Sequence, residues 1–154
     1  YALCKKIKAN MLEVFRKLHD EKEVRRFYVG GALGVDMWAA EQILRLKEQP
    51  GYEDIELVVA LPFVGHDAKW DQRSKRRMEF ILQHCSRKEV IGNEDCRESY
   101  VKRNCYMVDQ ANYLVAVYDD GRNLRSGTMQ CVRYAQKNHV PVVLIHPDTA
   151  IITW

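Results

Sequence analysis

Short apolar runs alternate with segments of helical periodicity along most of this chain, and that alternation limits its fold more than any other feature. The clearest runs cover residues 55–61, 113–118 and 141–145. Nearly continuous apolar runs are typical of strands covered on both faces, and strands separated by helices predict parallel βαβ units. We therefore predict an α/β fold, a Rossmann-like doubly wound and mostly parallel sheet of five or six strands with helices on both faces. Residues 113–118 should lie centrally in that sheet.

The length of 154 residues and the content of 47% hydrophobic and 29% charged residues fit one globular domain, residues 1–154. No apolar run approaches the roughly 20 residues that span a bilayer, so no membrane partner is expected. The cysteines are scattered without a C-x-x-C pair, and no secretory leader is apparent. Scattered thiols of this kind are typical of the reducing cytoplasm.

The first recognisable element is a helix, because apolar residues recur every three or four positions from Leu3 to Leu18. In a doubly wound sheet a helix normally follows a strand. We therefore expect a strand and its ligand loop to precede Tyr1 in the complete protein.

Two glycine loops, each between an expected strand and an expected helix, are the main candidates for a binding site. The first contains Gly30, Gly31, Gly34 and Asp36. Glycines there let the backbone approach a ligand, and the start of a helix offers free N–H groups to an anion. The alternative is a tight turn that needs glycine only for its backbone conformation. The spacing is not G-x-G-x-x-G, which disfavours an NAD dehydrogenase.

The second loop is Arg125-Ser126-Gly127-Thr128. Ser126 can cap the following helix, or the Ser, Gly and Thr together can surround a phosphate. Both loops follow parallel strands, and open α/β sheets bind ligands at the carboxyl edge of such strands.

Four blocks in order carry a family resemblance: GGALGVDMWAAE, then LPF with Trp70, then RNCYMVDQANYLVAVYD, then SGTMQCVRYAQKNHVPVVLI. Together they resemble the YpsA-like family of the SLOG superfamily, which also includes the Smf-type DNA-processing proteins and the lonely-guy phosphoribohydrolases. The resemblance implies a Rossmann-like fold with a pocket for a nucleotide or nucleotide derivative, and no settled reaction. The lonely-guy enzymes place a glutamate shortly after the Gly-Thr of the second loop, whereas Thr128 is followed here by Met129, Gln130 and Cys131. Without that acid/base group a phosphoribohydrolase of this type is disfavoured.

Several charged and aromatic residues are further candidates for the site. Arg103, which Asn104 follows, can bind a phosphate or carboxylate with two hydrogen bonds or can form an ordinary ion pair, and the resemblance favours binding. Trp70, in the loop that begins at Pro62, can stack on a base or cover the core. Asp36 can bind a ribose or stabilise the start of its helix. Glu41 and Asp119 are the weak catalytic candidates.

We predict that the chain binds a nucleotide-derived small molecule, as a sensor or sequestering module, with no certain cofactor and no metal. The alternatives are a hydrolase of nucleotide N-glycosidic or phosphate bonds, using Glu41 or Asp119, and a single-stranded DNA-binding protein of the Smf type. The basic run from Lys69 to Arg77 can contact nucleic acid but is more often a solvated helix face. Trp38, Met107 and Tyr134 favour a homo-oligomer if they lie on the surface.

Overall fold

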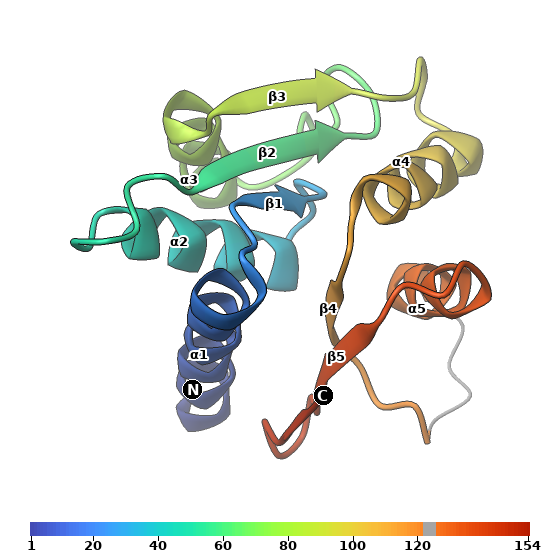
Figure 1. The fold of residues 1–154 in the computed structure, drawn as a ribbon. Coiled ribbons are helices and arrows are strands. Elements are labelled where there is room, and N and C mark those ends of the chain that lie inside the picture. The colour runs from blue at the N-terminus through green and yellow to red at the C-terminus, as the bar shows by residue number, and fades with distance from the viewer. Residues whose placement is uncertain (122–125) are drawn as a thin grey trace.

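The computed structural model describes residues 1–121 and 126–154, in which helices and strands alternate as predicted (Figure 1). The elements are α1 (Ala2–Lys22), β1 (Arg26–Val29), α2 (Val35–Lys47), β2 (Glu56–Leu61), α3 (Gln72–His84), β3 (Arg87–Val90), α4 (Arg97–Gln110), β4 (Leu114–Val117), α5 (Gly127–Lys137), β5 (Val142–Ile145) and β6 (Ile152–Thr153). Arg125 of the second glycine loop lies outside the described residues.

The strands form two sheets and not one, which corrects the prediction of a single sheet of five or six strands. One sheet has the order β1-β2-β3 and the other the order β4-β5-β6. Strand pairing is parallel within the first sheet and between β4 and β5, while β6 pairs antiparallel with β5. The prediction that residues 113–118 lie centrally is also wrong. Strand β4 is an edge strand, because among the described residues it pairs only with β5.

Helices pack against the strands of both sheets, whereas β3 is mostly exposed. On β1, Phe27 and Val29 are buried in one core with residues of α1 and α2, such as Phe15 and Ile43. On β4, Ala116 packs with Val132 of α5 in a second, smaller core. Figure 1 shows α1 and α2 on one side of the molecule and α4 and α5 on the other.

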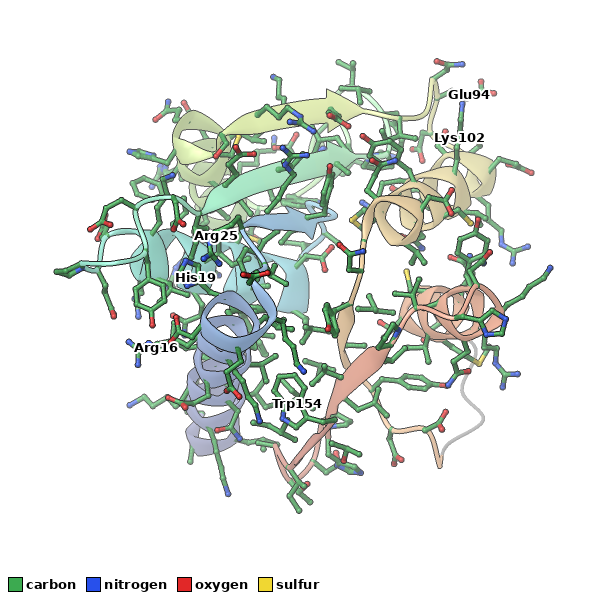
Figure 2. The ribbon with its side chains drawn as sticks, in the orientation of Figure 1. Arg16, His19, Arg25, Glu94, Lys102 and Trp154 are labelled. Atoms are coloured by element: carbon green, nitrogen blue, oxygen red, sulfur yellow. The ribbon has the colours of Figure 1, made fainter. Side chains whose placement is uncertain are left out.

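A cluster of polar side chains stabilises the connection between α1 and β1. The ring of His19, only 6% exposed, lies 2.9 Å from both Asp20 and Asp54. Arg25 donates to the carbonyl of His19 and lies 2.6 Å from Asp54. Figure 2 shows His19 and Arg25 close together at this corner, which fixes the direction in which β1 leaves α1.

The C-terminal tail, which the sequence left unassigned, folds back onto the N-terminal helix. Strand β6 extends the second sheet, and the ring of Trp154 lies 4.6 Å from Lys17 Nζ on α1 (Figure 2). No helix among the described residues is long and apolar enough to cross a membrane.

The three residues that favour a homo-oligomer if they lie on the surface are each half-buried: Trp38, Met107 and Tyr134. Trp38 packs against the main core, with Lys8 Nζ 5.2 Å from its ring. Tyr134 donates a hydrogen bond to Asp109. A homo-oligomer stays a prediction.

Candidate functional site

A cavity of about 960 Å³ lies between the two sheets, with β1 and β4 along its walls. Six of the twelve predicted ligand-binding residues line it, although they come from three separate segments of the chain. These are Gly30, Asp36, Arg103, Asn104, Gly127 and Thr128. Parts of both glycine loops therefore line one cavity.

Gly30 brings a carboxylate and a guanidinium close together at this site. A Cβ on Gly30 would lie 2.6 Å from Asp36 Oδ2 and 2.9 Å from Arg103 Nη1. Both distances are shorter than van der Waals contact. Glycine is thus required at this position by the approach of two charged side chains, and not by the conformation of a turn alone.

Arg103 is held rigidly within α4 and is only 6% exposed. Its Nη1 donates to the carbonyl of Gly30, and its Nε donates to Asn104 Oδ1 at 2.9 Å. Asn104 in turn donates to Gln130 Oε1 of α5 at 3.0 Å. A guanidinium buried in this way is pre-organised, so little conformational entropy is lost when an anion binds beside it.

Asp36 and Arg103 each affect the pKa of the other. Burial raises the pKa of Asp36, and the positive charge of Arg103 partly opposes that rise. Burial lowers the pKa of Arg103, and Asp36 opposes that fall. Asp36 Oδ2 also accepts a hydrogen bond from the backbone N–H of Ala32 at 3.3 Å. Each group therefore favours the charged form of the other.

The N-terminus of α5 also lines the cavity, through Gly127 and Thr128. Ser126 is the N-cap of α5, which is one of the two roles predicted for it. Its side chain accepts a hydrogen bond from the N–H of Met129 at 3.1 Å. A Cβ on Gly127 would meet only Asn104 Nδ2, at 3.8 Å, so the space beside this glycine is open. Free N–H groups at a helix start attract anions.

Cys131 also lines the cavity and was not among the predicted residues. Its spacing from Gly127 could have identified it, because residues four apart share a helix face. Burial, with the nearby negative charge of Asp36, raises the pKa of the Cys131 thiol to about 11. Near neutral pH it therefore lines the site as a neutral group and not as a thiolate nucleophile.

The other predicted ligand-binding residues lie elsewhere. Those absent from the cavity lining are Gly31, Gly34, Pro62, Trp70, Asp119 and Ser126. Gly31 has a φ of 68° and its carbonyl accepts from His66 Nε2 at 2.8 Å. Trp70 meets the ring of His66 edge-on at 5.2 Å and packs against the core. Their part in binding stays a prediction.

The two weak catalytic candidates are also separate from the cavity. Glu41 on α2 is an ion-pair partner of Arg77 on α3, with Glu41 Oε1 2.5 Å from Arg77 Nη2. Asp119 lies 3.4 Å from His146 Nε2. With Asp148, these two residues place three possible metal-ligand atoms within 4.8 Å of one another. The sequence did not suggest this group, because its members follow two different strands.

The close approach at Gly30 predicts a clear stability difference between two glycines. Gly30→Ala should lower the free energy of unfolding by about 1–3 kcal/mol, since the new methyl group displaces Asp36 and Arg103. The matched control is Gly127→Ala, where the space is open and φ is not positive. There alanine should be neutral or stabilising by up to about 1 kcal/mol. Urea denaturation measures both, and equal stabilities would contradict the described packing.

The model of the YspA SLOG family matches residues 2–150. A protein of Bacillus subtilis named "Uncharacterized SPbeta prophage-derived protein YoqJ" is 33% identical over 159 residues, which is 93% of this chain and 89% of that protein. UPF0398 proteins of Staphylococcus epidermidis and Bacillus cereus are 28% and 29% identical over 94 residues, or 60% of this chain. Those matches span about half the length of the UPF0398 proteins.

Proposed function

Because this chain belongs to the YspA SLOG family, we propose that it binds a nucleotide or nucleotide-derived small molecule and acts as a sensor or sequestering module. One observation carries the proposal. Both glycine loops and the buried Arg103 line the same cavity between β1 and β4. Cavities of several hundred Å³ with a few convergent polar groups are typical small-molecule sites.

The polar groups around the cavity suit the parts of a nucleotide. The backbone N–H groups at Gly127 and Thr128 lie at a helix N-terminus, where a phosphate is favoured by the helix dipole. Arg103, which lines the same cavity, supplies the balancing positive charge. In this arrangement Asp36 faces the sugar hydroxyls, which a carboxylate can bind as acceptors. The apolar walls beyond them, including Val29 and Val108, accept the base.

Binding without turnover is favoured by the chemistry of the same residues. Among the described residues, two carboxylates line the cavity, Glu23 and Asp36, and Asp36 is the group that balances Arg103. Glu41 is engaged by Arg77 and does not line the cavity. A general acid or base must reach the reacting bond within hydrogen-bond distance.

A panel of nucleoside 5′-monophosphates and the matching nucleosides tests the proposal. At least one monophosphate should raise the melting temperature, and its nucleoside should do so much less, because the phosphate supplies the contacts with α5. A ligand at a hundred times its Kd stabilises a protein by about 2.7 kcal/mol, which scanning calorimetry resolves easily. Chromatography of the same mixtures should detect no base release at an enzyme-like rate.

Two results would contradict this function. Robust base release that is lost in Glu41→Gln would favour the hydrolase, with Glu41 as its acid/base group. Binding of single-stranded oligonucleotides with steep salt dependence, and no response to any monophosphate, would favour a DNA-binding protein.

A further inference from the structure

Exposed apolar side chains lie at the carboxyl edge of the first sheet. Leu33, in the first glycine loop after β1, is 49% exposed, and Val64, just after β2, is 82% exposed. Strands β1 and β2 are parallel neighbours, so both loops leave the same edge. Tyr100, in the first turn of α4, is 38% exposed, and Figure 1 shows the carboxyl end of β2 directed toward α4. Exposed apolar surface beside a cavity is typical of a ligand-binding surface.

Tyr100 is linked to the candidate site by Arg103, which lies about one turn further along α4. The Cζ atom of Arg103 lies 5.7 Å from the centre of the Tyr100 ring, a distance at which a cation and an aromatic ring attract each other. The same guanidinium donates through Nη1 to the carbonyl of Gly30 and lines the cavity, whereas Tyr100 is absent from the lining. The Tyr100 ring therefore lies beside the cavity but outside it.

The Tyr100 ring is held in place by its neighbours. It meets the ring of Phe63, which is only 7% exposed, edge-on at 5.6 Å. The N–H of Gly92 donates to the carbonyl of Pro62 at 2.8 Å, and a Cβ on Gly92 would overlap with that carbonyl and with Ser99. The residues that precede Phe63 and Tyr100 are therefore packed tightly together. A ring fixed in this way loses little conformational entropy when another ring stacks on it.

The site also offers two separate positions for negative charge. One is the N-terminus of α5, at Gly127 and Thr128, and the other is the guanidinium of Arg103. A single phosphate needs only one of them, whereas a diphosphate carries a charge for each. Because Arg103 also contacts Tyr100, a phosphate at Arg103 would bring the group attached to it close to the Tyr100 ring.

We propose that the ligand is a dinucleotide, in which a diphosphate joins two nucleosides, and that Tyr100 stacks on its second base outside the cavity. This inference rests on the proposed function, because the first nucleotide occupies the cavity with its phosphate at the N-terminus of α5. The second phosphate lies beside Arg103. The second base then covers the exposed part of the Tyr100 ring, close to Leu33 and Val64.

The test uses the 154-residue chain and two sets of compounds. One set is adenosine monophosphate, adenosine diphosphate and diadenosine diphosphate, and the other is the three matching guanosine compounds. Titration calorimetry measures the affinity of each. In at least one set the dinucleotide should bind about tenfold more tightly than the diphosphate, because the two differ by the second nucleoside, whose base supplies the stacking.

Three variants assign that difference to one ring. Tyr100→Leu should remove the tenfold advantage of the dinucleotide, while the affinity for the diphosphate falls much less. Tyr100→Phe is the matched control, because it keeps the aromatic ring, and it should keep the advantage. Phe80→Leu, at a 53% exposed aromatic residue of α3, should change neither affinity. Melting temperatures show whether each variant is folded, and Tyr100→Met replaces Tyr100→Leu if the latter is not.

The outcomes separate this inference from the proposed function. If a monophosphate binds but no dinucleotide binds more tightly than its diphosphate, the inference is wrong and the proposed function stands. If Tyr100→Leu weakens binding of the monophosphate, the diphosphate and the dinucleotide equally, Tyr100 only positions Arg103, which also overturns the inference. If none of the six compounds binds, the proposed function fails and the inference fails with it.

Discussion

Replacement of Arg103 by Met should lower the free energy of unfolding by about 3–5 kcal/mol, the largest stability effect that we expect from an exchange at this site. The guanidinium is buried, bonds to the carbonyl of Gly30 and to Asn104, and balances the charge of Asp36. Methionine keeps much of the side-chain volume but leaves the Asp36 carboxylate without its cation. Urea denaturation at neutral pH measures the loss.

Two further variants separate charge from packing. The double variant Arg103→Met with Asp36→Asn should be more stable than the sum of its single changes predicts, because no unbalanced charge remains. Arg73→Met, at an exposed position of α3, should stay within about 0.5 kcal/mol of the parent. A loss at Arg103 no greater than that at Arg73 would mean that the buried pair contributes nothing.

The loss at Arg103 should also depend on pH. Burial already raises the pKa of Asp36, and removal of Arg103 takes away the charge that opposes this rise. A carboxyl with a raised pKa binds a proton more tightly in the folded protein than in the unfolded one. Stability of the variant should therefore recover as the pH falls through the folded pKa toward the unfolded value of about 4. A loss that grows as the pH falls would refute the assigned interaction.

Gly127→Asp should weaken binding of a nucleoside monophosphate by about 4 kcal/mol, or about a thousandfold. That is the repulsion between two unit charges about 4 Å apart at an effective dielectric constant of 20. The carboxylate would enter the open space beside the start of α5, where we propose that the phosphate binds. The affinity is measured by titration calorimetry, with whichever monophosphate raises the melting temperature of the parent.

Folding should be nearly unaffected by the same change. Gly127 does not have a positive φ, so a side chain adds no backbone strain, and an acidic residue in the first turn of a helix is tolerated or mildly stabilising. Gly127→Asn is the matched control, because it has almost the same shape without the charge, and it should lose much less affinity. If Gly127→Asp melts normally and binds its nucleotide as tightly as the parent, the N-terminus of α5 is not a phosphate site.

The order and type of the elements could be predicted from the sequence, and the arrangement of the sheets could not. The helix predicted from Leu3 to Leu18 lies within α1 (Ala2–Lys22), and the strand predicted at residues 113–118 lies at Leu114–Val117. These patterns are local, because they depend on which residues repeat every two or three to four positions. Which strands pair depends on backbone edges that meet through space. The apolar run of residues 113–118 therefore indicated burial correctly but not a central place in a sheet.

The candidate site, like the fold, could be predicted from the sequence only in part. The sequence by itself determined that two glycine loops follow strands and precede helices, which is enough to expect Gly30 and Gly127 near one binding edge. Only the tertiary structure decided that Arg103 and Asp36 approach each other over Gly30, and that Glu41 is engaged by Arg77. The physical reason is distance. Periodicity reports neighbours along the chain, whereas the charge, burial and pKa of a group depend on neighbours that only packing brings within a few ångströms.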